Sequence, residues 1–192
     1  MIPALRVPGP SRLAAFPVLA AALAVAAPGL AQPAAPYAEH TGREIKALSP
    51  EQVDQLLTGQ GMGLALAGEL NGYPGPKHVL ELAAELDVSE DQRQAVQRVH
   101  DAMLEQAKEL GRQIVEAERR LDARFAEGEA TAEILRPALD HLGALQAALR
   151  HAHLNAHLET KTLLTEAQVA RYTHLRGYAA EGEHPGHHHG HR

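Results

Sequence analysis

Histidine is the residue type with the most chemical potential in this chain, which has 13 His against 18 Lys and Arg in 192 residues. Three of them, His151, His153 and His157, lie close together. Residues four apart on a helix project from the same face, so His153 and His157 could hold one metal ion between them. Imidazole nitrogen suits Zn²⁺, Ni²⁺, Co²⁺ or Cu²⁺. The pair predicts a divalent-metal site; the alternative is that both rings simply pack and hydrogen-bond at a helix interface.

Two ligands do not complete a metal site. The others would come from another helix or from a second subunit, and His100, Met103 and Glu159 are the candidates within this chain. His151 points about 180° away from the predicted apolar face of its helix and is not a candidate. A site built on imidazole is expected to lose its metal below about pH 6, where the ligands become protonated.

A second group of histidines lies in the segment 179–192, which has almost no apolar residues and is predicted to be a disordered tail. Such a tail binds divalent metals weakly in almost any context. It is interpreted as a native metal-capturing segment, as a tail without metal function, or as a remnant of an expression tag. The tail has five histidines, all of them candidate ligands: His184, His187, His188, His189 and His191.

The composition argues against several other chemistries. The absence of Cys excludes disulfides, thiolate metal sites and Cys nucleophiles. Only two serines, Ser49 and Ser89, follow residue 31, and both fit helix caps better than a nucleophile. The acidic residues are expected on solvated helix faces, with no candidate carboxylate pair. A net charge of −6 argues against nucleic-acid binding. We expect no enzymatic activity and no required cofactor.

The N-terminal region has the pattern of a secretory signal peptide. Arg6 and Arg12 precede an apolar run at 13–27, and small residues follow at Gly29 and Ala31. A run of this length spans roughly 22 Å as a helix, short of a ~30 Å bilayer core. Cleavage after Ala31 would leave a chain of net charge −8, because only Arg6 and Arg12 are lost. The sequence therefore predicts export, with the periplasm of a Gram-negative cell as the expected location.

Three capping boxes organise the rest of the chain. Each is a Ser or Thr followed three residues later by Gln, at Ser49-Gln52, Ser89-Gln92 and Thr165-Gln168. They predict helices that begin at these three positions. The first reaches Gly59, resumes over 64–70 and is followed by a short helix over 77–86. The last runs from Thr165 to about Arg176.

Two long helices are expected between these caps. Apolar residues at helical spacing extend from Ser89 to about Ala126 and again from Thr131 to about Leu163, with a kink or broken first turn expected at Pro137. The short reversal over 127–130 makes the two helices antiparallel neighbours. We therefore expect an all-α fold: a long antiparallel hairpin with shorter flanking helices, comprising a signal peptide at 1–31, a linker at 32–47, a helical domain at 48–178 and the tail. So thin a fold leaves apolar surface that a homodimer would cover.

The capping boxes also carry a resemblance. The sequence Leu164-Thr165-Glu166-Ala167-Gln168 matches the LTxxQ motif of the Spy/CpxP family, and Val88-Ser89-Glu90-Asp91-Gln92 resembles a variant first copy of it. The resemblance covers roughly residues 80–178. It implies a periplasmic all-α protein that forms a cradle-shaped antiparallel dimer. Chaperones of this family are typically basic in the cradle, whereas this chain is acidic.

Two functions follow from the resemblance, and a third interpretation is a dimeric helical accessory protein with neither activity. The first is an ATP-independent chaperone or envelope-stress protein, which binds unfolded periplasmic clients and acts with a membrane stress-sensing component. A polar rim of such a cradle would include Arg93, Arg98, Arg112, Arg119 and Arg120. The alternative is a heavy-metal sensor or buffer similar to the CnrX-like and ZraP-like branch. Members of that branch bind metal through histidines on long helices, as His153 and His157 would here.

Overall fold

The computed structural model describes residues 35–178. Within that range every regular element is helical, which confirms the predicted all-α class. The predicted signal peptide and the His-rich tail lie outside the described residues. A 3₁₀ helix, η1, spans Ala38–Gly42, and the α-helices are α1 Pro50–Thr58, α2 Leu66–Glu69, α3 Pro76–Glu81, α4 Glu90–Ala126, α5 Ala132–Thr162 and α6 Glu166–Leu175.

All three predicted capping boxes are present. Ser49, Ser89 and Thr165 each accept a hydrogen bond from the backbone N–H three residues on, and the Gln side chain at that position accepts one in return from the N-cap amide. The second and third boxes also join each other. Gln92 Nε2 donates to Gln168 Oε1 at 2.9 Å, and Gln168 Nε2 donates to Gln92 Oε1 at 3.1 Å. The starts of α4 and α6 are therefore clamped together.

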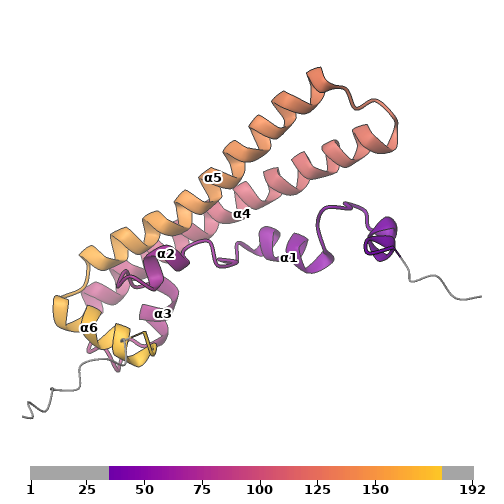
Figure 1. The fold of residues 1–192 in the computed structure, drawn as a ribbon. Coiled ribbons are helices and arrows are strands. Elements are labelled where there is room, and N and C mark those ends of the chain that lie inside the picture. Colours follow the sequence, from indigo (N-terminus) through magenta and orange to yellow (C-terminus); the bar gives the residue numbers. More distant parts are fainter. Residues whose placement is uncertain (1–34, 179–192) are drawn as a thin grey trace, which may run out of the picture. The chain divides into compact units, whose positions relative to one another are not determined.

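The two long helices α4 and α5 run antiparallel side by side, as predicted (Figure 1). Gly128 makes the reversal between them in the left-handed region, at φ 72°. Thr131 then caps α5 by accepting from the amide of Ile134. Of the two outcomes expected at Pro137, a kink or a broken first turn, the broken turn is not observed, because α5 passes through this residue as one continuous helix.

The short helices are shorter than predicted. The segment 64–70 is helical only over α2, since Gly63 at φ 76° turns the chain just before it. The helix expected over 77–86 ends at Glu81, and turns carry the chain to Asp87, which has φ 51°. These turns allow Leu86 to be buried at 1% exposure beneath the start of α4.

Part of the expected linker 32–47 is packed. Ile45 is buried in the core, Lys46 pairs with Asp122 at 2.9 Å, and Glu44 pairs with Arg119 at 2.8 Å. The segment before α1 is thereby attached to the distal half of α4. Contacts with the helical domain begin a few residues before the predicted boundary at 48.

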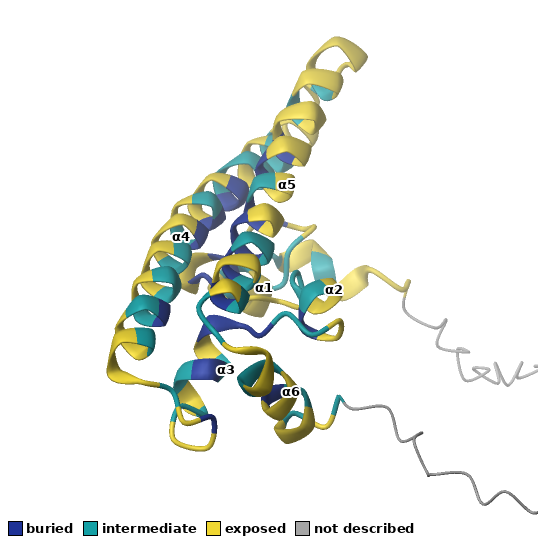
Figure 2. Ribbon diagram, turned by 90° about the vertical axis from the view of Figure 1, so that its left-hand side faces the viewer, coloured by how far each residue is buried: buried dark blue, intermediate teal, exposed yellow. Residues whose placement is uncertain are grey.

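Buried side chains form two clusters. The first lies between α1, α4 and α5 and includes Leu56, Ile114 and Leu145. The second joins α3, the start of α4 and α6 around Val79, Val96 and Tyr172. Figure 2 shows that burial is concentrated in these regions and that the hairpin end of α4 and α5 is mostly exposed. Among the described helices, none combines the length and apolarity that crossing a membrane demands.

Candidate functional site

A cavity of about 550 Å³ lies where the loop at 59–63 and the start of α3 meet α4 and α5. The chain brings potential metal ligands to its wall from five separate segments. They are Met62 in the loop, His78 on α3, His100 and Met103 on α4, and His153 and His157 on α5, together with Glu69 at the end of α2. The predicted pair on α5 is thus part of a larger cluster.

The register of the hairpin explains this convergence. Gln92 Nε2 donates to the carbonyl oxygen of Leu163 at 2.8 Å, so these residues lie at the same level of α4 and α5. From that point His100 lies about 12 Å along α4, while His157 and His153 lie about 9 and 15 Å along α5. His100 therefore stands at a level between the two histidines of the neighbouring helix.

Of the candidate ligands predicted from the sequence, some line the cavity and others do not. His100 and Met103 line the cavity with His153 and His157. Glu159 does not: it is exposed, and its Oε1 accepts a hydrogen bond from Asn155 at 2.6 Å. His151 is exposed on α5, as its helical position predicted. The five tail histidines lie outside the described residues.

His153 is the most enclosed of these side chains, at 5% exposure. Its Nε2 atom is fully buried and has no hydrogen-bond partner within residues 35–178. Burial lowers the pKa of this imidazole, and the neighbouring His157 lowers it further. Both effects favour the uncharged ring, and Nε2 is a buried polar atom of the kind that native proteins normally pair.

In the other three histidines the Nδ1 atom is close to an oxygen. His157 Nδ1 lies 2.8 Å from the carbonyl oxygen of Tyr73, which can only accept, so Nδ1 carries the proton. His100 Nδ1 lies 3.1 Å from Asp101 Oδ1, and His78 Nδ1 lies 3.2 Å from Glu69 Oε1. A metal-binding histidine usually donates its second ring N–H in this way, which leaves Nε2 as the ligand atom.

Glu69, His78 and Met62 are the site residues that the sequence analysis does not name, and Glu69 is the most deeply buried of them. The expectation that the acids lie on solvated faces is wrong here, because Glu69 is only 6% exposed. Its carboxylate accepts from Tyr172 Oη at 2.5 Å and from the Gly75 amide at 3.2 Å, and Arg176 Nε lies 3.5 Å away. His157 Nδ1 lies 3.6 Å from the same carboxylate. Glu69 therefore connects the cavity wall to α6.

Gly75 makes room for this arrangement. A Cβ atom built at Gly75 would lie 2.9 Å from His157 Cε1 and 3.2 Å from Glu69 Oε2. The imidazole edge thus occupies the space that a side chain would fill. One feature of the sequence could have indicated that Glu69 is buried: it is the single charged residue in the stretch 64–76. No comparable feature of the sequence marks His78 as a site residue.

The ligand atoms are close but not assembled into a finished site. No three His, Asp or Glu side chains in the described part of the chain are already arranged to hold a metal ion. The chemistry of the donors nevertheless fits a transition metal, since the cavity wall carries several imidazoles and one buried ring nitrogen lacks a partner. Rotation of side chains into the cavity would be needed to complete coordination.

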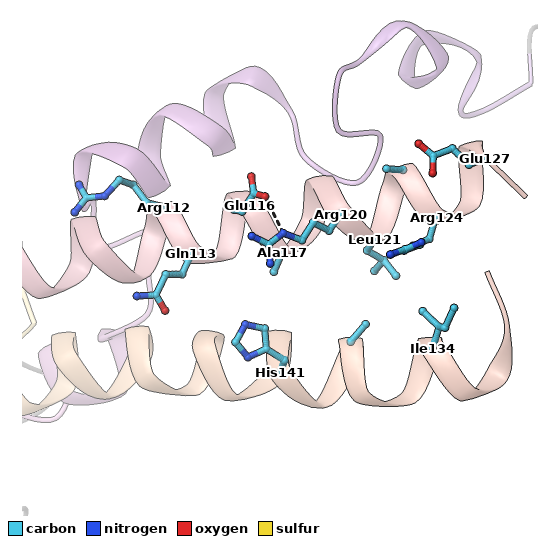
Figure 3. Close-up of a pocket in the computed structure, with 12 residues that line it drawn as sticks. Arg112, Gln113, Glu116, Ala117, Arg120, Leu121, Arg124, Glu127, Ile134 and His141 are labelled. Carbon is cyan, nitrogen blue, oxygen red and sulfur yellow. Dashed lines mark hydrogen bonds and ion pairs between the residues drawn. The ribbon is translucent and has the colours of Figure 1, made fainter. Parts of the chain in front are cut away.

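A second hollow of about 630 Å³ lies between α4 and α5 near the hairpin end (Figure 3). Its floor is apolar, with Leu121 from α4 and Ile134 from α5 facing each other across it. Its rim carries Arg112, Arg120 and Arg124. Each arginine is paired with a glutamate, Arg120 with Glu116 at 2.8 Å, so the rim is charged but largely compensated.

The histidine cavity and the hairpin groove are two hollows in the described part of the chain that differ in what they could bind. The cavity offers nitrogen and sulfur donors, whereas the groove offers apolar area with a polar rim. Comparison with known proteins adds no further assignment: no family model, curated protein or solved structure matches this chain.

Proposed function

We propose that this protein binds a transition-metal ion in the histidine cavity and serves as a metal sensor or buffer. The observation that supports this most directly is the buried, unpartnered Nε2 atom of His153 in a cavity lined by three further histidines. A buried polar atom without a partner costs about 1–3 kcal/mol. Metal coordination would remove that cost, which gives the site a reason to be built this way.

The donor set indicates which ions to test first. Imidazole nitrogen is a borderline ligand that suits Zn²⁺, Ni²⁺, Co²⁺ and Cu²⁺. His100 and His157 are the best-oriented partners of His153, because their Nδ1 atoms are held by Asp101 and by the Tyr73 carbonyl. The bound ion would supply positive charge at the junction of α4, α5 and the loop at 59–63. The protein's part is to select the ion and to respond to it through these elements.

Calorimetric titration with Zn²⁺ and Ni²⁺ tests this function. The chain is first freed of tail binding by replacing His184, His187, His188, His189 and His191 with Ser. Saturable submicromolar binding is then expected, and it should be lost in His100→Ala and in His153→Ala with His157→Ala. His151→Ala is the matched control, because this histidine lies on the same helix but is exposed. The proposal is overturned if no transition-metal ion binds saturably once the tail histidines are gone.

The hairpin groove supports a second function, ATP-independent binding of unfolded proteins. Besides the apolar floor, Phe125 at 59% exposure and Leu139 at 45% exposure stand on the same end of the hairpin. Apolar area of this kind, with a rim of Arg112, Arg120 and Arg124, suits extended apolar segments of a client. The protein should then suppress aggregation of a denatured model protein near stoichiometric ratios.

A variant pair makes the chaperone test specific. Phe125→Ser removes exposed apolar surface beside the groove, whereas Leu175→Ser removes a similarly exposed apolar side chain on α6. Suppression should weaken in the first variant and persist in the second. If a fivefold excess of the unaltered protein leaves aggregation unchanged, the chaperone function is excluded.

The remaining features of the function rest on sequence and resemblance. We propose a non-enzymatic periplasmic protein of Spy/CpxP type, exported by residues 1–31 and acting as a homodimer alongside a membrane stress-sensing component. Exposed apolar side chains away from the hairpin end, Leu70 at 55% and Leu158 at 52% exposure, favour the dimer, which would cover them. A monomeric mass in light scattering at micromolar concentration would contradict the dimer. Sequencing the N-terminus of the protein recovered from periplasm tests cleavage after Ala31.

A further inference from the structure

The cavity contains an unusual share of the chain's sulfur. The sequence has three methionines and no cysteine, and one of the methionines is Met1. The other two, Met62 and Met103, both line the histidine cavity. Every sulfur atom between residues 2 and 192 is therefore at this one site, although Met62 and Met103 come from different elements.

The two methionines reach the cavity from different elements, the loop at 59–63 and α4. Met103 lies on α4 one turn from His100, so both project from the same face of that helix. Met62 follows Gly61, where an added Cβ would lie 4.0 Å from His153 Nδ1. The loop thus passes close to His153 of α5 just before Met62, and Gly59 earlier in the loop lies against Leu104 of α4. The cavity wall therefore carries sulfur from the loop and from α4, and imidazoles from α3, α4 and α5.

Met62 is not explained by packing. Its side chain is 41% exposed, so it contributes little to the core. Its backbone is left-handed, at φ 46°, a conformation that is unfavourable for a residue with a Cβ. Glycine lies on both sides of it, at Gly61 and Gly63. A glycine at position 62 would adopt the left-handed conformation without strain. An exposed methionine held in this backbone conformation at the mouth of a histidine cavity is better suited to bind a ligand than to pack.

The charge of the cavity restricts the ion further. Within residues 35–178, Glu69 is the only acidic residue that lines it, its carboxylate already accepts from Tyr172 and Gly75, and Lys77 also lines the cavity. The other donors are imidazole nitrogens and thioether sulfurs, which coordinate a metal as uncharged ligands. A neutral donor set in a partly enclosed cavity compensates one positive charge more easily than two. Thioether sulfur is also a soft ligand, which favours d¹⁰ monovalent ions over Zn²⁺ or Ni²⁺.

We propose that the cavity takes a soft monovalent ion, Cu(I) or Ag(I), with Met62 and Met103 as sulfur ligands beside the imidazoles of His100 and His153. This inference rests on the proposed metal-binding function and specifies its ion. Binding is simple coordination: lone pairs of sulfur and nitrogen are donated to the ion, and no redox step occurs once it is supplied as Cu(I) or Ag(I).

Methyl NMR tests the assignment directly, with Ag(I) as the probe because it is stable in air. The full-length sequence, carrying the five tail His→Ser replacements, is expressed with ¹³C-labelled methionine methyl groups and purified as the cell processes it. Stoichiometric Ag(I) should shift the methyl signals of both Met62 and Met103. An additional methyl introduced by Leu139→Met, on the exposed hairpin end, should stay in place and serves as the internal control.

Two variants confirm the ligands. Met62→Leu and Met103→Leu keep side-chain volume while removing sulfur, so the fold should survive. Each should weaken Ag(I) binding, and Cu(I) binding measured by competition with a chromophoric chelator, by about tenfold or more, since one soft donor is lost. Zn²⁺ binding should change little in either variant.

The outcomes separate this inference from the function on which it rests. If Zn²⁺ or Ni²⁺ binds through His153 while Ag(I) leaves both methyl signals unchanged, the metal-binding function stands and the soft-ion assignment is wrong. If neither divalent ions nor Ag(I) bind the tail-free chain, both are wrong. If both methyl signals shift and both Leu variants lose Ag(I) affinity, the assignment is supported.

Discussion

Tyr172 on α6 donates a 2.5 Å hydrogen bond to the carboxylate of Glu69 at the end of α2, across 103 residues of sequence. Tyr172 is completely buried, and burial followed by the contact with Glu69 raises the pKa of its hydroxyl, so the group remains a donor at physiological pH. Glu69 in turn faces His157 and His78. The hydrogen bond therefore connects the C-terminal helix to the wall of the histidine cavity.

Tyr172→Phe tests this connection. The substitution leaves the ring in place but deprives a buried carboxylate of its shortest hydrogen bond, which should lower the free energy of unfolding by about 1–3 kcal/mol. Urea unfolding followed by circular dichroism measures the change. Tyr37→Phe is the matched control, because Tyr37 is 74% exposed and its loss of a hydroxyl should have almost no effect. Equal stability of Tyr172→Phe and the unaltered protein would show that the contact is energetically unimportant.

The glutamine clamp is the second connection that reaches α6. Gln92 and Gln168 each hold their own capping box and also bond to each other, and Gln168 Nε2 reaches the Leu86 carbonyl at 3.2 Å. A double-mutant cycle with Gln92→Ala and Gln168→Ala should give a coupling energy of about 0.5–1.5 kcal/mol. Thermal or urea unfolding of the four proteins provides the values.

Gln52→Ala distinguishes the stability that comes from a capping box from the stability that comes from the contact between Gln92 and Gln168. Gln52 makes the same capping-box bond to Ser49 and is exposed, so it has no second role. Its replacement should cost only the local cap contribution, and it should be additive with Gln168→Ala. A coupling energy between Gln92 and Gln168 no larger than that between Gln52 and Gln168 would contradict the clamp.

The parts of this fold that were predictable are those set by nearby residues. Ser49, Ser89 and Thr165 begin helices because their hydroxyl groups and the glutamines three positions on satisfy amides within the same turn. The one-faced apolar pattern likewise predicts α4 and α5. The pairing of Gln92 with Gln168 was not predictable, because it depends on how α6 packs against the start of α4.

The same distinction explains the site. His153 and His157 were recognisable because their four-residue spacing is a property of one helix. Glu69 and His78 reach the cavity only through the turns around Gly72 and Gly75, whose course depends on tertiary packing. The residue type alone does not show that Glu69 is buried, because most glutamates are exposed. Its partners, Tyr172 and Arg176, come from the far end of the chain.

Close approach of α1 to α4 predicts opposite effects at two helical glycines. A Cβ at Gly111 would lie 1.9 Å from the carbonyl oxygen of Leu56, so Gly111→Ala must push α1 away from α4 and should cost about 1–3 kcal/mol or more. Gly143, on α5, has nothing within 4 Å of its Cβ position. Gly143→Ala should instead stabilise the protein by about 0.5–1 kcal/mol. Urea midpoints that move in the same direction for both variants would contradict this packing.

His153 predicts a pH dependence of stability in metal-free buffer. Its pKa is lowered in the folded protein by burial and by His157, while in the unfolded chain it has the usual value near 6.5. Below that value the imidazole is protonated in the unfolded chain but stays largely unprotonated in the folded protein, so acid favours unfolding. Stability from this residue is complete above about pH 6.5 and declines as the pH falls toward the lowered pKa of the folded state.

His153→Leu removes this effect because the new side chain is apolar and cannot titrate. Between about pH 7.5 and 5 the variant should lose less free energy of unfolding than the unaltered protein, as measured by urea unfolding in the presence of a chelator. His151→Leu, exposed on the same helix, should keep the full pH dependence. Because both variants retain His157, His78 and Glu69, the difference between them isolates the buried ring. Identical pH profiles for the two variants would mean that the pKa of His153 is the same in the folded and the unfolded chain, and that burial does not disfavour protonation of this ring.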